Sequence, residues 1–422
     1  MSSTPTTPEG EHPAPRGVSR RALLGRLALG GVGAAIASTA AVPAVAVAPA
    51  ADPAPSGSDG QVPALGSVVE PFRGPHQAGI TTPMQATATF VALDLRDDVD
   101  RDALIRMMVL LTDDIDRLSQ GTPALADPQP ELATVPARLT VTVGYGRGAL
   151  VAAGLEDQAP AWLAEGLPEF SIDRLQKRWS DGDVILQVAA EDPVTVSHAL
   201  RVLLTDADPF ATVRWVQTGF HRPANTTPGG TGRNLMGQVD GTVNPTSGTE
   251  DFDDVVWVPN GPSWLVGGTA MLVRRIAMDL KTWGAMDLVG KEESIGRRLS
   301  DGAPLTGGDE FTAPDYEAVD ENGFLVIPPT SHMRRAHAAA PAERILRRPY
   351  NYDDGIAKDG SADAGLIFAA YMADPIAQYV PIQKRLAAAD VLNVWTTPIG
   401  SALFAVPRGV AEGEYIGQAL LG

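Results

Sequence analysis

Alternating and helical patterns of apolar residues in the first half of the chain predict strands and helices in a regular order. From Gln85 to Leu95, apolar side chains alternate with threonines, which is typical of a strand. In Asp100–Leu118, apolar residues recur every three or four positions and predict an amphipathic helix. Further strands are predicted at Leu139–Val143, Val184–Ala190 and Val213–Phe220, and Asp192-Pro193 begins a helix that runs to about Leu204. The resulting order, β-α-β followed by β-α-β, is that of a ferredoxin-like unit.

The second half of the chain repeats this pattern. Strands are predicted at Ala270–Met278, Leu366–Met372 and Leu403–Val406, with a helix at Ile376–Ala388. A further apolar strand is predicted at Phe324–Ile327, and His332 is expected in the loop that follows it. In both halves an apolar strand ends at an Asp-Pro pair that begins a helix. We therefore predict an α+β protein with a duplicated ferredoxin-like fold, in which two antiparallel sheets carry flanking helices. The expected domains are residues 70–230 and 231–422, divided in the Thr226–Gly232 loop.

The first 51 residues have the composition of an export signal. Arg20 and Arg21 precede an uncharged, Ala- and Gly-rich run, and Ala46 and Ala48 provide a small-residue cleavage site. The alternative is a transmembrane anchor, which the glycines and Pro43 of this run disfavour. We expect a Tat signal peptide at 1–51 and a linker at 52–69. The protein would then be extracellular or in the cell envelope, with no membrane span after the signal is removed.

Charge and cysteine content exclude several classes of function. The formal net charge is −18, which disfavours nucleic acid and anionic lipid as partners. The chain has no cysteine, so disulfides, thiolate catalysis, Cys-ligated metal clusters and covalent CxxCH haem are excluded.

The segment Arg233–Pro245 shows neither helical nor strand periodicity and is expected to be a turn-rich loop. Asp240 lies between Gly237 and Gly241, with Asn234 on its N-terminal side. These glycines permit positive φ or a close approach of the backbone to a partner. Asp240 is either an acid–base group that faces a flat ligand or a turn residue that caps its own backbone.

This loop resembles the GxxDG motif of the dye-decolourising peroxidases, in particular the exported branch that includes deferrochelatase/peroxidases. The resemblance extends over about residues 70–420. Matching segments are Gly74–Ile80, Leu139–Gly146, Gly182–Pro193, Ser331–Arg334, Leu346–Tyr352 and Gln383–Leu386. The resemblance implies a haem-binding, barrel-like dimeric-ferredoxin fold with one non-covalent haem b per chain, in the second domain. It also implies hydrogen peroxide and organic electron donors as partners, and it allows a homo-oligomer.

The resemblance assigns the residues around the haem. His332 becomes the axial ligand, with His337 as the alternative to test against it, and Asp240 with an arginine forms the distal pair. That arginine is Arg347 or its neighbour Arg348, and we prefer Arg347. Further expected cofactor contacts are Arg334, at a propionate, and Gly237, Gly241 and Asn234. Asp390 either orients His332 or caps a helix end.

The chemistry implied is that of a peroxidase. The distal aspartate moves a proton between the peroxide oxygens, and Arg347 stabilises the developing charge. Since a carboxylate has a reference pKa of about 3.9, we expect the highest activity in acid. Trp283 and Tyr352 are preferred as electron relays to bulky dyes, ahead of Tyr350, Trp264 and Tyr371; core packing is the alternative for each.

Three functions fit these residues. The first is a secreted haem peroxidase that oxidises dyes and phenolics. The second is a haem-handling deferrochelatase in iron acquisition. The third is an exported ferredoxin-like binding protein without haem.

Overall fold

A computed structural model describes residues 64–223, 226, 230–357 and 360–422. The strands are β1 (Thr87–Leu95), β2 (Thr140–Tyr145), β3 (Val184–Ala190), β4 (Ala211–Phe220), β5 (Thr269–Met278), β6 (Leu346–Arg347), β7 (Tyr350–Ile356), β8 (Ala362–Met372) and β9 (Thr396–Val406). The helices are α1 (Arg101–Ser119), α2 (Arg147–Ala152), α3 (Ala161–Glu165), α4 (Pro193–Ala207), α5 (Glu250–Val256), α6 (Leu280–Ala285), α7 (Leu288–Ile295), α8 (His332–Ala336), α9 (Pro375–Ala389) and α10 (Gln418–Leu421). The predicted signal peptide and the first twelve linker residues, 52–63, lie outside the described residues.

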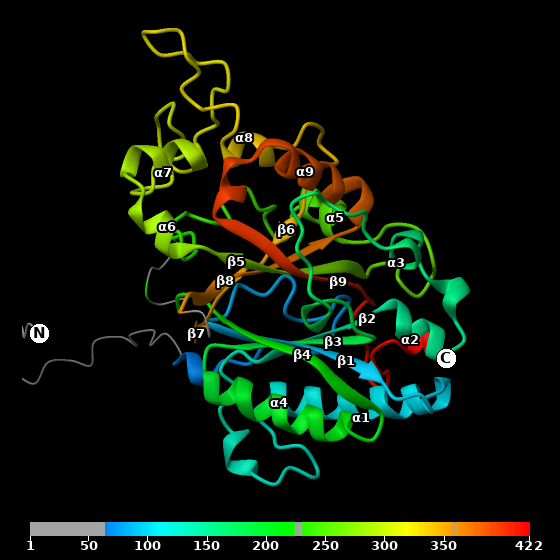
Figure 1. Ribbon diagram of the computed structural model, residues 1–422. Coiled ribbons are helices and arrows are strands. Elements are labelled where there is room, and N and C mark those ends of the chain that lie inside the picture. The colour runs from blue at the N-terminus through cyan, green and yellow to red at the C-terminus, as the bar shows by residue number, and fades with distance from the viewer. Residues whose placement is uncertain (1–63, 224–225, 227–229, 358–359) are drawn as a thin grey trace, which may run out of the picture. The chain divides into compact units, whose positions relative to one another are not determined.

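The strands confirm the predicted duplication. The first half has the neighbour order β4-β1-β3-β2 and the second has β9-β5-β8-β7, so each half has the ferredoxin-like order 4-1-3-2. The two halves join edge to edge, where Tyr145 pairs with Ala405 and Phe220 pairs with Asn351. The strands therefore close into a ring, and β6 adds to it by pairing with β8 (Figure 1).

The two Asp-Pro pairs begin equivalent helices, as their sequences predict. The side chain of Asp192 accepts from the backbone N–H of Thr195 at the start of α4. The side chain of Asp374 accepts from two backbone N–H groups at the start of α9. In both helices proline occupies the first turn, where its missing N–H leaves no intrahelical bond unmade. Each half thus places one capped helix after its third strand.

Alternation along the strands divides the apolar side chains between two faces. On β1, Val91 and Leu93 pack towards α1 and α4, whereas Phe90 and Ala92 face the interior between the two halves. Figure 1 shows α1 and α4 on one side of the strands and α9 on the other. A third apolar cluster lies at one end of the second half and includes Met236, Trp283, Leu366, Leu392 and Trp395.

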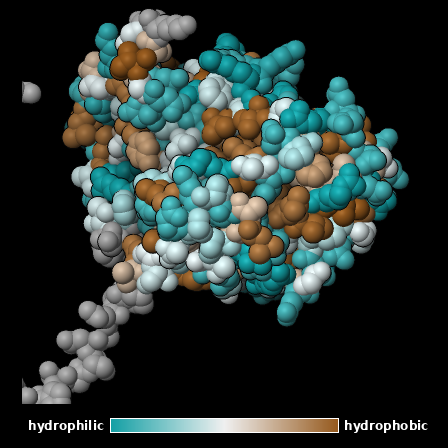
Figure 2. Space-filling model, turned by 90° about the horizontal axis from the view of Figure 1, so that it is seen from below, coloured by the Kyte–Doolittle hydropathy of each residue, from teal (hydrophilic) through white to brown (hydrophobic). Residues whose placement is uncertain are grey.

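The outer face of α1 and α4 presents mixed chemistry to solvent. Seen from that side, apolar side chains form separate patches among hydrophilic ones (Figure 2). Val109 and Leu110 on α1 are 46% and 47% exposed. Among the described residues, no helix combines the length and apolar character that crossing a bilayer requires.

One predicted strand is wrong, and several elements were not predicted. Residues 324–327 form no strand; Leu325 makes only an isolated bridge to Val319, and Phe324 is 73% exposed. This run is apolar, but the structure places no strand of the ring beside it. Strand β7 and helices α5, α6, α7 and α8 are short and had no periodic pattern from which to predict them.

Candidate active site

The loop around Asp240 is held by Asn234 and by two glycines. The side-chain carbonyl of Asn234 accepts from the backbone N–H groups of Met236 and Gln238, at 3.0 and 3.2 Å. Gly237 and Gly241 have φ of +84° and +127°, as the sequence predicted, and these values favour glycine. Asn234, expected to contact the cofactor, therefore acts as the residue that caps this turn.

The carboxylate of Asp240 binds an arginine rather than its own backbone. Arg347 Nη1 donates to Asp240 Oδ1 at 2.8 Å. Arg347 is fixed in turn by Asn244, which accepts from its backbone N–H at 3.0 Å and donates to its carbonyl at 2.7 Å. The tight-turn interpretation of Asp240 is wrong, because Asn234 performs that role. Asn244 had no assigned role, although it lies in the same motif.

The choice between the two neighbouring arginines follows from strand geometry. Arg347 and Arg348 are consecutive in an extended segment, so their side chains point to opposite sides. Arg348 is 5% exposed and donates to the carbonyl of Thr82 at 2.5 Å, on the interior side of the ring. Arg347 is therefore the member of the pair that contacts Asp240.

A histidine–aspartate pair lies in the second half. His332 is the first residue of α8, not a loop residue as expected, and its Nδ1 lies 2.6 Å from Asp390 Oδ2. The other oxygen of Asp390 accepts from the backbone N–H of Leu392 at 2.9 Å. Asp390 thus caps a short 3-10 turn and contacts the imidazole with its other oxygen. Because Asp390 engages Nδ1, Nε2 of His332 is left to bind a ligand.

The electrostatics of His332 connect this pair to Asp240 and Arg347. Burial lowers the pKa of His332, but the charge of Asp390 and its hydrogen bond outweigh burial, so the pKa lies above its ordinary value. The charge of Arg347 lowers this pKa and that of Asp240 raises it. Both charges therefore lie near enough to influence the imidazole.

The other described histidines contact different partners, although His221 lines the same small pocket as Asp240. His337, the alternative ligand, follows α8 and has its ring 4.9 Å from that of Tyr316. His198 contacts Asp127 at 2.9 Å within the first half. His76 stacks on Trp257 with 3.6 Å between ring centroids, and His221 contacts the carbonyl of Arg222. His12 lies outside the described residues.

Apolar and cationic side chains complete a site that fits a haem. The cluster with Met236, Leu366 and Leu392 extends from the Asp240 loop to the segment after Asp390, and forms an apolar wall. Arg334 donates to the carbonyls of Tyr316 and Ile327, the latter at 2.9 Å. Its Nε is buried without a partner. A free imidazole nitrogen, an apolar wall and a guanidinium for a propionate are the groups that a non-covalent haem requires.

Arg297 is a further cation of this region, which the sequence did not single out. It donates to the carbonyls of Gly302 and Glu310, at 2.7 and 2.8 Å. Burial lowers its pKa; Tyr316 and Glu310 oppose this effect, and the charge of Arg347 adds to it. Within the described part of the chain, neither Arg297 nor Arg334 has a carboxylate partner. Both are therefore available to an anionic group.

The two preferred relay residues occupy different environments. Trp283 is 4% exposed, donates to the carbonyl of Met236 at 3.0 Å and lies edge-on to Trp395 at 5.2 Å. Tyr352 is fully buried in the interior of the ring, where its ring lies 4.0 Å from the guanidinium of Arg275. Trp283 thus borders the Asp240 loop, whereas Tyr352 faces away from it.

Comparisons with known proteins agree with this geometry. Residues 77–221 match the family model "Dyp-type peroxidase, N-terminal", and residues 231–411 match "Dyp-type peroxidase, C-terminal". The chain is 40% identical over 360 residues to the dye-decolorizing peroxidase of Thermobifida fusca (strain YX), covering 82% of this chain and 83% of the relative. It is 35% identical over 373 residues to the deferrochelatase of Escherichia coli (strain K12), covering 83% and 87% respectively.

Solved structures give the same result. A crystal structure of the DyP-type peroxidase from Cellulomonas bogoriensis superimposes with a TM-score of 0.82 at 51% identity, covering 85% of this chain and 99% of that one. An oxyferrous/water complex of DtpA from Streptomyces lividans has the same TM-score at 44% identity, with coverage of 85% and 99%. Haem is thus this chain's cofactor, and the haem-free alternative is not retained. The chain belongs to the Dyp-type peroxidase family, whose members are haem-dependent oxidoreductases that act on hydrogen peroxide.

Proposed function

We propose that the chain uses hydrogen peroxide to oxidise dyes, phenolics and related organic donors, and that Asp240, Arg347 and His332 perform the central roles. The observation that carries this proposal is the 2.8 Å contact between Asp240 and Arg347, whose charges both act on His332. A carboxylate held by a guanidinium is suited to proton transfer beside a bound oxidant.

The second half of the chain would hold the cofactor. Nε2 of His332 would bind the iron of one non-covalent haem b, and bound haem supplies the redox-active iron that reduces peroxide. Asp390 keeps the proton on Nδ1 and fixes the orientation of the imidazole ring. Arg334 and Arg297 would receive the propionates, since each carries a half-buried charge without a carboxylate partner in the described residues.

Asp240 and Arg347 would act on peroxide. Asp240 accepts the proton of one peroxide oxygen and returns it to the other oxygen, which leaves as water. Arg347 donates to the oxygen on which negative charge develops while the O–O bond breaks. Because a carboxylate remains a base at a pH where an imidazole is protonated, we propose an acidic optimum. An optimum near neutral pH would count against Asp240 as the base.

The test compares two aspartate–arginine pairs of the same chain. Asp240→Asn should lower kcat/KM for peroxide by about 10²- to 10⁴-fold while haem content stays unchanged. Asp251 forms an exposed pair with Arg344 and provides the matched control. Asp251→Asn should leave kcat/KM within about twofold, since exposed pairs contribute little. Equal losses in the two variants, or none in Asp240→Asn, would reject the assignment.

A second function, release of iron from haem, is favoured by the relatives named deferrochelatase at 34–35% identity. The same His332 and Arg334 would hold haem as substrate. Incubation of the protein with haem would then yield iron-free porphyrin, detected by its fluorescence, without added peroxide. Haem recovered intact from such incubations would leave the peroxidase function alone.

Location and assembly are further parts of the proposal. The Arg20-Arg21 pair and the uncharged run after it support export through the Tat pathway to the cell envelope or beyond. Replacement of both arginines by lysine should retain the protein in the cytoplasmic fraction; unchanged export would reject a Tat signal.

We also propose Trp283 as the first electron relay, ahead of Tyr352, and allow a homo-oligomer.

A further inference from the structure

A carboxylate outside the sequence motifs contacts the Asp240 loop at two places. Oε1 of Glu310 accepts from the hydroxyl of Thr231 at 2.5 Å and from the hydroxyl of Thr242 at 3.0 Å. These threonines precede and follow Asp240 in the chain. A single oxygen atom therefore connects the two ends of the loop that carries the proposed proton-transfer group.

The same two ends are coupled directly to the backbone of Asp240. The N–H of Asp240 donates to the carbonyl of Gly232, next to Thr231, at 2.8 Å. A Cβ added to Gly241 would lie 3.4 Å from the side chain of Thr231, so the two sides of the loop are in contact. Displacement of Thr231 or Thr242 would therefore move Asp240 relative to Arg347.

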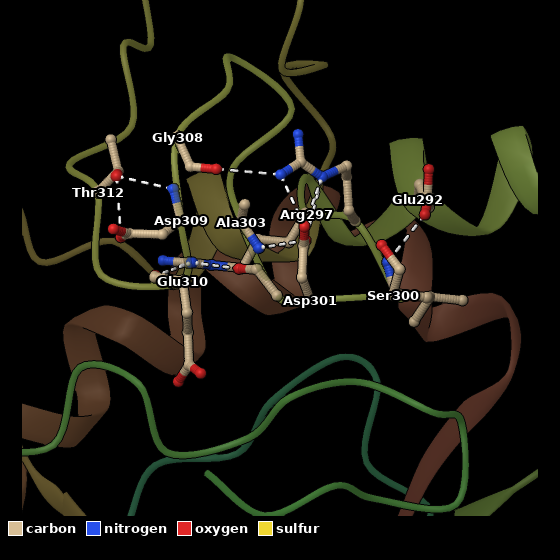
Figure 3. Close-up of polar contacts among 12 residues, drawn as sticks. Glu292, Arg297, Ser300, Asp301, Ala303, Gly308, Asp309, Glu310 and Thr312 are labelled. Carbon is tan, nitrogen blue, oxygen red and sulfur yellow. Dashed lines mark hydrogen bonds and ion pairs between the residues drawn. The ribbon is translucent and has the colours of Figure 1, made fainter. Parts of the chain in front are cut away.

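Glu310 lies in a segment whose backbone is held by hydrogen bonds from two arginines. Arg297 donates to the backbone carbonyl of Glu310 at 2.8 Å. Arg298 forms an ion pair with Asp301 at 2.8 Å and donates to the carbonyl of Gly308 at 3.0 Å. Figure 3 shows this network, with the carboxylate of Glu310 extending away from it. The segment thus presents one carboxylate, from a backbone that hydrogen bonds hold in place, to the Asp240 loop.

We propose that Glu310 is the positioning residue of Asp240, an inference that rests on the proposed function. Glu310 holds both ends of the Asp240 loop, and through them the carboxylate that Arg347 contacts. Proton transfer to and from peroxide requires the acid–base group to lie within hydrogen-bond reach of both oxygens. A loop released by about 1 Å would lose much of this geometry, a displacement that can cost about 10²-fold in rate.

The first test compares three variants of neighbouring residues. Glu310→Ala should lower kcat/KM for peroxide by about 10- to 100-fold with unchanged haem content. Glu310→Gln keeps an oxygen acceptor for both threonines and should stay within about threefold. Asp309→Ala is the matched control, because the Asp309 carboxylate accepts from Phe311 and Thr312 and not from the Asp240 loop. A Glu310→Ala enzyme with wild-type kcat/KM would overturn the proposal.

The second test asks whether Glu310 works through Asp240. In an Asp240→Asn background, Glu310→Ala should cause no further loss; losses that multiply would contradict the proposal. If Glu310→Ala does not fold, Thr242→Val takes its place in this test. Because Thr242→Val removes only one of the two hydroxyl donors to Glu310, it should lower kcat/KM for peroxide by a smaller factor.

A third measurement needs neither haem nor turnover. Amide hydrogen exchange of the haem-free protein should be faster in residues 231–245 of Glu310→Ala than in wild type or Asp309→Ala. Unchanged exchange there would overturn the positioning role. If Asp240→Asn alone left turnover intact, the proposed function would fail, and the exchange rates would still decide whether Glu310 holds the loop.

Discussion

The two halves of the molecule each contain a histidine–aspartate pair, and the pairs differ in access rather than in chemistry. In the first half, Nε2 of His198 lies 2.9 Å from Asp127, and the two side chains are 3% and 0% exposed. In the second half, Nδ1 of His332 lies 2.6 Å from Asp390, and the imidazole is 34% exposed. The first imidazole is enclosed by protein, whereas the second retains an open face.

The free nitrogen of each ring shows what this difference means. Nδ1 of His198 is buried without a hydrogen-bond partner. Nε2 of His332 is not among the buried, unpartnered atoms of the described residues, and the charges of Asp240 and Arg347 act on its ring. The same side-chain pair is therefore enclosed in one half, and in the other it leaves a ring nitrogen for the ligand binding that we propose.

The origin of the open face lies in the connections between strands. In the first half, β1 is followed by α1, a helix of 19 residues with one apolar face buried against the sheet. In the second half, the chain from β5 to β7 forms the short helices α6, α7 and α8. This connection carries His332, Arg297, Glu310 and Arg347. The two halves thus share the same sheet, and the candidate site lies in the half where short helices follow the first strand in place of one long helix.

The largest effect should come from removing His332, and removal of His198 provides the matched comparison. His332→Ala removes the proposed ligand, so its haem affinity should fall by more than the roughly 10- to 100-fold typical of outer-sphere changes. His198→Ala should bind one haem per chain and instead lose about 1–3 kcal/mol of unfolding free energy, because Asp127 is left buried without its partner. Haem titration followed by the Soret band and urea unfolding give the two readings.

His337→Ala provides the second control, since His337 lies close to His332 in the chain but stacks against Tyr316. It should bind haem like the wild-type protein. If His332→Ala kept full haem affinity while His337→Ala or His198→Ala lost it, the ligand would have been assigned to the wrong residue.

The aspartates of the two pairs should give a smaller effect of the same kind. Asp390→Asn weakens the hydrogen bond that orients His332 and should lower haem affinity about 10- to 100-fold. Asp127→Asn should leave haem affinity unchanged, because its histidine is enclosed in the first half. Equal haem binding by both variants would show that Asp390 serves only as the cap of the turn at Leu392.

Local patterns predicted the scaffold but not the complete site. Strand β3 was predicted at its observed bounds, Val184–Ala190, and the Asp-Pro pairs located α4 and α9, because alternation and capping are properties of adjacent residues. Helices α6 and α7 were missed, although Asp279 and Asp287 cap them and provided a usable signal. The run at 324–327 shows the converse error, since apolar residues alone do not supply a neighbouring strand.

The site depends on residues that are distant in the chain. His332 and Asp390 are separated by 58 positions, and Asp240 and Arg347 by 107. Only the family resemblance brought these four residues together before the structure did. Arg297 and Glu310 lie outside the motifs and have no local pattern that distinguishes them from Arg298 or Asp309. Their roles follow only from the contacts that the fold creates.

The two relay candidates should respond differently to substitution, and only the change at Trp283 should lower oxidation of bulky donors, by roughly tenfold. Trp283→Phe should lower dye oxidation while peroxide still changes the haem spectrum, because Trp283 borders the Asp240 loop. Tyr352→Phe should leave dye oxidation unchanged, since the adjacent charge of Arg275 opposes loss of an electron from this ring. Stopped-flow spectra with steady-state dye oxidation separate the two steps. Unchanged dye oxidation in Trp283→Phe would reject Trp283 as a relay.

The smallest expected effect lies in the first half, where pH should act on stability rather than on turnover. Burial, a hydrogen bond to Asp114 and the charge of Asp114 raise the pKa of Asp206 to about 7. The pKa of Asp206 in the folded protein exceeds the unfolded value of about 3.9. The stabilisation that the Asp206–Asp114 pair gives to the folded state is therefore complete below about pH 3.9 and is lost as the pH rises through about 7. When the pH is raised from 5 to 8, the unfolding free energy of the haem-free wild-type protein should fall by about 1 kcal/mol more than that of haem-free Asp206→Asn. The difference is small because solvent screens a partly exposed pair.

Urea unfolding of both proteins across this range measures the difference, and parallel pH profiles would show that the two carboxyl groups share no proton in the folded state. The pH profile of peroxide turnover should remain the same in Asp206→Asn, since Asp206 lies on α4 and the proposed proton-transfer group lies in the second half. A shifted turnover profile would contradict the division of roles between the halves. It would mean that a charge in the helix layer of the first half reaches the Asp240 loop through the ring of strands.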